Sequence, residues 1–292
     1  MQKMFRGAGV ALITPFDNEA NVDYEALVSH VDYVIEGGVD YLLALGTTSE
    51  VPTLSFDEQV AVVDAVIKEN SRQVPLLVGV GGNSTSEVIK NIKFYESREI
   101  DAFLVVTPYY NKPSQKGLYE HYAAVAKSTH KPLILYNIPA RASVNMLPQT
   151  TLRLAQDFPN IVGIKEASGI MSQIMKIIKN RIDDFLVISG DDIITLPLMS
   201  AGADGVISVV ANAFPGELSM MVDYIENGDY QTASEIHYKL FDIIQACFAE
   251  GNPVGVKAIM SQMNLIESVV RLPLVEASLD LKENIKQLLK QI

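Results

Sequence analysis

Eight apolar runs of strand length, most of them followed by a segment with helical periodicity, constrain this chain more than any other feature of its sequence. The runs lack the polar alternation of a half-exposed sheet, which is typical of parallel strands buried on both faces. They cover residues 10–14, 41–45, 75–80, 102–106, 132–136, 161–165, 185–189 and 205–209. The helical patterns cover residues 23–36, 55–70, 84–97, 114–129, 148–157, 171–180 and 193–201.

Two of these helical segments begin with a serine at the N-cap position and have a glutamate three residues later. Ser55 is followed three residues later by Glu58, and Ser84 is followed by Glu87 at the same spacing. In a capping box the serine hydroxyl accepts from the N–H of the third residue, while the glutamate accepts from the serine N–H. We therefore expect a capping box at the start of both helices.

Eight strand–helix units over about 225 residues predict an α/β fold of the (β/α)8 kind, a TIM barrel. An open doubly wound sheet is the alternative, but its Gly-x-Gly-x-x-Gly fingerprint is absent after the first strand. After about residue 223 the strand patterns stop, and residues 230–248, 253–263 and 279–292 have helical patterns. We expect a barrel with the active site over residues 1–224 and a C-terminal helical region over residues 225–292.

Charge and composition exclude several classes of partner. The net charge of -12 argues against a nucleic acid, because such binding depends on Lys and Arg neutralising phosphates. No apolar run approaches the roughly 18 residues that a membrane span requires. Cys247 is the single cysteine of the chain, which excludes an internal disulfide and indicates a reducing compartment. We expect a cytoplasmic enzyme.

Polar side chains gather at the carboxyl ends of the predicted strands, which form the active-site face of such a barrel. They are Thr47, Thr48, Tyr109, Tyr110, Tyr136, Arg141 and Lys165. Together they supply hydroxyls, phenols for proton transfer, a guanidinium suited to a carboxylate, and an amine. Asp191 and Asp192 are adjacent acids, a weak metal signal that hydrogen-bonded loop residues explain better, so we expect no metal site.

Lys165 ends an apolar run that is expected to be buried. Burial disfavours the ammonium form, so such a lysine reaches solvent, pairs with a carboxylate or holds a neutral amine. A neutral amine is a nucleophile that forms a Schiff base with a carbonyl compound. The stretch alone favours the first two interpretations, and the rest of the chain decides between them and the third.

Five segments, each at the end of a predicted strand, carry a resemblance to a known family. They are GTTSE at 46–50, TPYYNKPSQ at 107–115, YNIPAR at 136–141, GIKEA at 163–167 and SGDD at 189–192. In this order they resemble the dihydrodipicolinate synthase (4-hydroxy-tetrahydrodipicolinate synthase) family, class I aldolase-type enzymes related to N-acetylneuraminate lyase. The similarity covers essentially the whole chain.

The resemblance implies a lyase that condenses pyruvate with L-aspartate 4-semialdehyde in the diaminopimelate route to lysine. It assigns to Lys165 the Schiff base with pyruvate and to Tyr136 the proton transfers at that adduct. Thr47 and Tyr110 match the other members of a proton relay. Thr48 matches the site of the pyruvate carboxylate. No cofactor is implied, since the covalent imine activates the substrate.

Further positions follow from the same resemblance. Arg141 matches the residue that holds the carboxylate of the second substrate. Gly190 and Ile207 match positions whose backbone lines the lysine amine. The family is usually a homotetramer, a dimer of dimers, in which the counterpart of Tyr110 crosses the tight dimer interface.

The sequence departs from the family pattern at two sites. Ser49 stands where the family usually has glycine, and a positive φ there would cost roughly 1 kcal/mol. The family's site for inhibitory lysine is matched in part, which predicts weak or absent inhibition by lysine. The matching residues are Asn83, Glu87 and Tyr109, and the departures are Val51, Phe56 and Gln59.

Two alternative functions remain open from the sequence. Another pyruvate-dependent aldolase, such as N-acetylneuraminate lyase or a 2-keto-3-deoxy sugar acid aldolase, would share the lysine. Arg141 favours the synthase, because a guanidinium suits an amino-acid carboxylate better than a sugar polyol. A non-catalytic keto-acid-binding barrel would not require a lysine among tyrosines and threonines.

Overall fold

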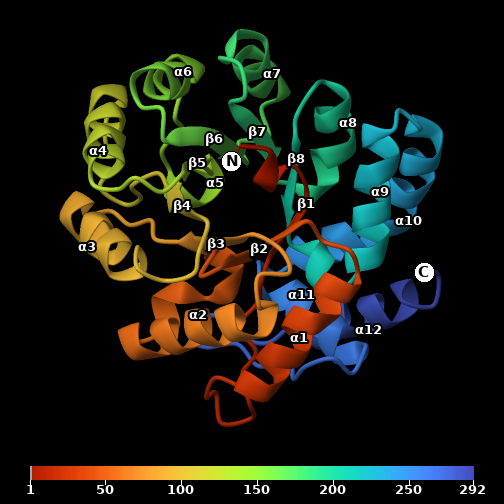
Figure 1. The fold of residues 1–292 in the computed structure, drawn as a ribbon. Coiled ribbons are helices and arrows are strands. Elements are labelled where there is room, and N and C mark those ends of the chain that lie inside the picture. The colour runs from red at the N-terminus through yellow and green to blue at the C-terminus, as the bar shows by residue number, and fades with distance from the viewer. Residues whose placement is uncertain (1) are drawn as a thin grey trace. The chain divides into compact units, whose positions relative to one another are not determined.

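The computed structural model describes residues 2–292, with side chains from residue 4 onward, and its eight strands form a closed barrel in the order β1 to β8 (Figure 1). The strands are β1 (Gly7–Ala11), β2 (Tyr41–Ala44), β3 (Leu76–Gly79), β4 (Ala102–Val106), β5 (Leu133–Asn137), β6 (Ile161–Glu166), β7 (Leu186–Ser189) and β8 (Gly205–Ser208). Almost every strand residue is buried, as expected of parallel strands covered on both faces. The predicted TIM barrel is confirmed.

Helices follow the strands and then continue alone to the C-terminus. The α-helices are α1 (Tyr24–Glu36), α2 (Phe56–Asn70), α3 (Thr85–Tyr95), α4 (Gln115–Lys127), α5 (Pro139–Ala142), α6 (Pro148–Asp157), α7 (Met171–Asn180), α8 (Thr195–Ser200), α9 (Pro215–Glu226), α10 (Tyr230–Phe248), α11 (Val254–Gln262) and α12 (Leu279–Leu288). Short 3-10 turns are η1 (Gln2–Phe5), η2 (Thr47–Ser49), η3 (Val51–Thr53), η4 (Asp192–Ile194) and η5 (Val210–Asn212). Helices α10 to α12 form the predicted C-terminal helical extension.

The chain divides into two compact units, which are described separately. One comprises Pro75–Ile207 with the N-terminal residues through Arg6, and the other comprises Gly7–Val74 and Ser208–Ile292. The expected boundary between residues 224 and 225 stays a prediction. Among the residues that the structure describes, no helix combines the length and the apolar character of a membrane-crossing segment.

In the first unit, strands β4 to β7 are paired in a register that aligns the chemistry-bearing side chains. Tyr136 on β5 lies beside Lys165 on β6, and the next pair along the strands is Asn137 and Glu166. Because successive strand residues point to opposite faces, the first pair shares one face and the second pair shares the other. The second face packs on helices, since Gln173 of α7 contacts the Glu166 carboxylate. Lys165 and Tyr136 therefore point away from the helix layer.

The second unit joins the first strands of the chain to its last helices. Strand β1 pairs with β2, and α9 packs against β1, α1 and α10, while α10 also contacts α11 and α12. Asn212 connects these parts, because its Oδ1 accepts from the N–H of Ile13 and its Nδ2 donates to the carbonyl of Ala11. His30 lies 2.9 Å from the same Oδ1 through Nε2.

Some local predictions are confirmed and others are wrong. The capping box at Ser55 is present, with Glu58 accepting from the serine N–H at 2.8 Å. The box at Ser84 is wrong: this residue is the N-cap of α3, but its hydroxyl lies 3.1 Å from that of Ser86 and makes no cap bond. Helices α5 and α9 were not among the predicted elements. Each begins with proline at its first position, a helix-start signal.

Candidate active site

Lys165 and Tyr136 lie side by side on neighbouring strands of the first unit. The Lys165 Nζ is 4.7 Å from the centre of the Tyr136 ring, and both side chains are buried, 5% exposed each. The pairing of β5 with β6 fixes this separation through the backbone. The sequence placed both residues at strand ends, and the structure brings them together.

Burial changes the acidity of the Lys165 amine. Removal from water lowers its pKa from 10.5 to about 8, the negative charge of Asp192 opposes this shift, and the positive charge of Arg141 adds to it. About a tenth of the amine is then neutral at pH 7, against less than about 0.1% for an ordinary lysine. The ammonium form still predominates at pH 7, but burial raises the neutral share by more than about a hundredfold, which is the change that a Schiff-base lysine requires.

A polar network lies behind the Lys165–Tyr136 pair, on the helix-facing side of the strands. The Asn137 amide donates to both oxygens of Glu166, at 3.1 and 3.2 Å, and the N–H of Ser168 donates to one of them at 2.9 Å. Gln173 reaches the other oxygen, and Asn145 contacts both Gln173 and Asn137. Burial raises the pKa of the Glu166 carboxyl. The network fixes the residues next in sequence to Tyr136 and Lys165.

Three further predicted site residues belong to the first unit. Arg141 lies on the short helix α5, is exposed, and is close enough to influence the charge of Lys165. Gly190 follows β7, and a Cβ built there would meet the Lys165 Cε at 3.0 Å, so a larger residue would displace the lysine. Ile207 lies in β8 and is buried.

Tyr110 is 88% exposed, whereas Tyr136, the other tyrosine of the predicted relay, is buried. It stands on a tight turn after β4, where the N–H of Asn111 donates to the carbonyl of Tyr109 and Tyr110 has a φ of 71°. The Asn111 amide donates to the carbonyl of Asn83 at 3.0 Å, which ties the turn to the loop before α3. The predicted position of Tyr110 in a proton relay stays a prediction.

Thr47 and Thr48 lie in the second unit, on the 3-10 turn η2 that follows β2. Thr47 is half-buried and Thr48 is buried, with its Oγ1 accepting from the Asn252 amide at 3.0 Å. The backbone N–H of Glu50 donates to the carbonyl of Thr47 and closes the turn. The two threonines therefore lie on a turn whose last residue, Glu50, is hydrogen-bonded back to its first, Thr47.

Ser49 does not have the positive φ that would strain a serine at this position. The positive φ values of this loop fall on Leu45 and Glu50, both at 54°, and not on Ser49. The Ser49 hydroxyl instead donates to the carbonyl of Leu12 at 2.6 Å, and the Thr14 hydroxyl donates to the Ser49 carbonyl. The serine therefore attaches the loop to the end of β1 through a bond that glycine could not make.

The residues compared with an inhibitory lysine site are distributed over both units. In the first unit, Glu87 is an exposed partner of Lys90 at 3.6 Å, and Tyr109 is 40% exposed. In the second unit, Phe56 is 45% exposed, and the Gln59 amide donates to the carbonyl of Leu54. The expectation of weak inhibition stays a prediction.

Lys257 is a second buried lysine that the sequence did not single out. It lies on α11, is fully buried, and makes a 2.6 Å ion pair with Glu50. Burial lowers its pKa to about 8 as well, with the Glu50 carboxylate opposing the shift. A charged residue inside an apolar helical run was the only signal in the sequence that could have identified it.

A closed (β/α)8 barrel with a buried lysine amine on β6 and a phenol on the adjacent strand is an architecture of lyases of the class I aldolase type. Comparison with known proteins leads to the same class of enzyme. The model of the dihydrodipicolinate synthetase family matches residues 4–292. The chain belongs to this family.

Individual relatives cover nearly the full length. A 4-hydroxy-tetrahydrodipicolinate synthase from Parabacteroides distasonis is 48% identical over 98% of this chain and 97% of its own. A solved structure described as the first monomeric dihydrodipicolinate synthase variant is 41% identical, with a TM-score of 0.97 over 99% and 97% of the two chains. The enzyme from Acinetobacter baumannii, solved with pyruvate, is 39% identical, with a TM-score of 0.95 over 98% of each chain.

Proposed function

We propose that this protein is a 4-hydroxy-tetrahydrodipicolinate synthase that condenses pyruvate with L-aspartate 4-semialdehyde through a Schiff base on Lys165. The observation that carries the proposal is the buried Lys165 amine, with a pKa of about 8, set 4.7 Å from the ring centre of Tyr136. Family membership and relatives bearing this name support the synthase over another aldolase.

Imine formation requires one neutral amine and several proton transfers. The Lys165 Nζ attacks the keto carbon of pyruvate and forms a carbinolamine, which loses water to give the imine. The Tyr136 phenol delivers a proton to the departing hydroxyl, which leaves as water. The geometry suits this role because the pairing of β5 with β6 holds the phenol beside the amine.

Carbon–carbon bond formation uses the imine as an electron sink. Loss of a proton from the pyruvate methyl group to the Tyr136 phenolate gives an enamine, whose carbon attacks the aldehyde of the second substrate. The amino group of that substrate then adds to the imine carbon, which closes the ring and releases the Lys165 amine. No bound cofactor is required on this proposal. The Arg141 guanidinium holds the carboxylate of aspartate semialdehyde, a task suited to its planar pair of donors. Gly190 and Ile207 line the amine, and a glycine at 190 leaves room for the Lys165 side chain.

The second unit supplies the remaining roles. Thr48 and the adjoining backbone bind the pyruvate carboxylate, while Thr47 takes the place in the proton relay that the family resemblance assigns to it. Tyr110 completes the relay from a neighbouring subunit, which explains an 88% exposed tyrosine on a fixed turn. The assembly is then a homo-oligomer, a dimer of dimers. The single buried cysteine supports a cytoplasmic location.

A coupled assay tests the proposal directly. Purified protein is given pyruvate and L-aspartate 4-semialdehyde in one reaction and N-acetylneuraminate in a second, and pyruvate consumption or release is followed. The synthase reaction alone is expected. Cleavage of N-acetylneuraminate without condensation would contradict the proposal and favour the sugar acid aldolases.

A further inference from the structure

Glu50 and Lys257 form a fully buried ion pair within the second unit. Their side chains are 1% and 0% exposed, and the Lys257 Nζ lies 2.6 Å from one Glu50 oxygen. The same Nζ donates to the carbonyl of Val269 at 2.9 Å and lies 4.0 Å from the ring centre of Phe16. The other Glu50 oxygen accepts from the backbone N–H of Arg271 at 3.0 Å. Each carboxylate oxygen therefore has a partner from the C-terminal part of the chain.

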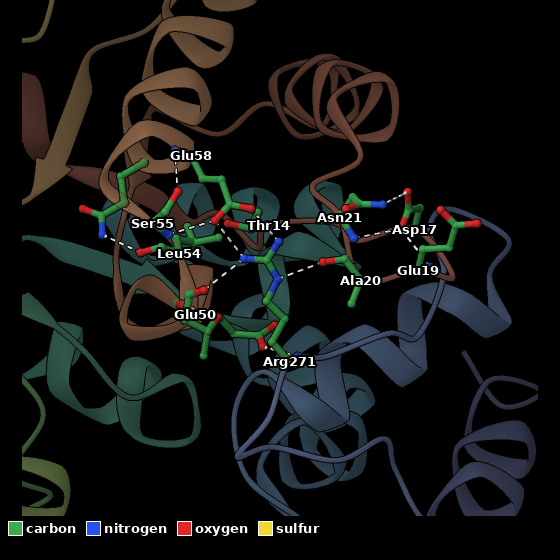
Figure 2. Close-up of polar contacts among 12 residues, drawn as sticks. Thr14, Asp17, Glu19, Ala20, Asn21, Glu50, Leu54, Ser55, Glu58 and Arg271 are labelled. Atoms are coloured by element: carbon green, nitrogen blue, oxygen red, sulfur yellow. Dashed lines mark hydrogen bonds and ion pairs between the residues drawn. The ribbon is translucent and has the colours of Figure 1, made fainter.

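Arg271 extends this cluster toward the first helices. Figure 2 shows its guanidinium directed at Glu58, to which it makes two bonds of 2.6 and 2.9 Å. It also donates to the carbonyls of Ala20 and Thr53. The segment around Arg271 is thus attached independently of Glu50, and it offers the Glu50 carboxylate a fixed donor.

The cluster ends two residues from Thr48. Glu50 has the left-handed backbone conformation, φ 54° and ψ 35°, and its N–H donates to the carbonyl of Thr47. Asn252, close before α11, donates to the Thr48 hydroxyl. Asn252 therefore contacts Thr48 directly. Lys257 and Arg271 contact Glu50, whose N–H closes the turn that carries Thr48.

The net free energy of a buried ion pair is small, so the Glu50–Lys257 pair is not explained by stability alone. Desolvation offsets most of the attraction in a buried pair, and replacing both partners by hydrophobic residues of similar volume is often neutral or stabilising. What such a pair supplies is a defined geometry, because its bonds are directional and break completely when one partner is removed. Here that geometry is imposed on the turn that carries Thr47 and Thr48.

We propose that Lys257 is a positioning residue for pyruvate binding, which acts through Glu50 to hold the Thr47–Thr48 turn in the conformation that receives the substrate carboxylate. Lys257 touches no reacting atom in this role. The inference rests on the proposed function, which assigns Thr48 to that carboxylate. It makes the C-terminal helical extension part of the substrate site.

The test compares Glu50→Gln, Lys257→Met and the double variant E50Q/K257M with Lys282→Met. The double variant removes both buried charges and retains an acceptor for the Arg271 N–H. Lys282→Met makes the same change at an exposed pair with Glu276. In the double variant, we expect KM for pyruvate to rise about tenfold while kcat stays within about twofold. A displaced turn weakens the binding of the substrate and of the transition state equally, and such a loss raises KM without changing kcat. Glu50→Gln should raise KM less, and Lys282→Met should leave it unchanged.

Hydrogen exchange provides a readout that does not depend on activity. Peptides covering residues 46–54 should exchange faster in the double variant than in the wild type and in Lys282→Met, while the midpoint of urea unfolding stays unchanged. An unchanged KM with unchanged exchange would overturn the inference. Failure of the wild type to condense the two substrates would instead contradict the proposed function, and the exchange result would still decide whether the pair holds the turn.

Discussion

Replacement of Lys165 by methionine should make the protein more stable while it removes activity. The pKa of this amine falls from 10.5 to about 8 on folding, which at about 1.36 kcal/mol per pKa unit corresponds to a burial penalty of about 3 kcal/mol near neutral pH. Methionine fills a similar volume without a charge. Lys165→Met should therefore raise the free energy of unfolding by up to about 3 kcal/mol at pH 7.

The pH dependence of this gain distinguishes it from a packing effect. Between pH 8 and 10.5 the unfolded chain holds a proton on this amine that the folded chain has lost, so the wild type gains stability as the pH rises. The advantage of Lys165→Met should be complete below pH 8 and should disappear toward pH 10.5.

Urea denaturation at pH 7 and at pH 10, at one protein concentration, measures both effects. With a slope of about 3 kcal/mol per molar, the midpoint should shift upward by about 1 M at pH 7 and by much less at pH 10. Lys176→Met, at an exposed lysine of α7, is the matched control and should show neither shift. A destabilised Lys165→Met protein, or a gain in stability that is equal at both pH values, would show that desolvation of the Lys165 ammonium is not the cause.

Further consequences concern the chemistry and its support. Tyr136→Phe should lower kcat by about 10²- to 10⁴-fold with the barrel intact by circular dichroism, because it removes a proton-transferring group. The value of kcat/KM for pyruvate should rise with pH and level off above about pH 8 as Lys165 loses its proton; a flat profile from pH 6 to 9 would contradict this. Glu166→Leu removes the acceptor of the Ser168 N–H and two of the acceptors of the buried Asn137 amide and should cost about 3 kcal/mol in urea unfolding, whereas Glu87→Leu at an exposed site should not. Millimolar lysine should inhibit weakly or not at all, and strong inhibition in an activity titration would show that the substitutions in the lysine site are tolerated.

The order and number of the strands could be predicted from the sequence because each buried parallel strand is a continuous apolar run. Residues 102–106 were placed without error as β4, and residues 171–180 as α7. Strand β1 was placed too late, at residues 10–14, because Gly7 and Gly9 are poor strand formers outside this context. Helix boundaries at Ser55 and Ser84 looked alike in sequence, but the two serines differ in backbone conformation, with φ -62° and ψ 161° at Ser55 and φ -119° and ψ 115° at Ser84, whose hydroxyl contacts Ser86 instead.

The candidate site could be predicted in part, because some of its residues stand out in the local sequence and others depend on distant partners. Lys165 and Tyr136 stood out because polar groups at the ends of buried strands are costly unless they have a task. Lys257 did not stand out, because its partner Glu50 lies 207 positions away and nothing local to α11 indicates an ion pair. Long-range pairing of this kind appears only when the chain is folded.

Borohydride reduction in the presence of pyruvate, followed by peptide mass spectrometry, shows whether Lys165 forms the Schiff base. Among the residues whose side chains the structure describes, Lys165 and Lys257 are buried lysines with pKa values of about 8, so the identity of the modified residue is informative. We expect a single reduced pyruvate adduct on Lys165. An adduct on Lys257, or none under conditions in which the protein turns over pyruvate, would contradict it.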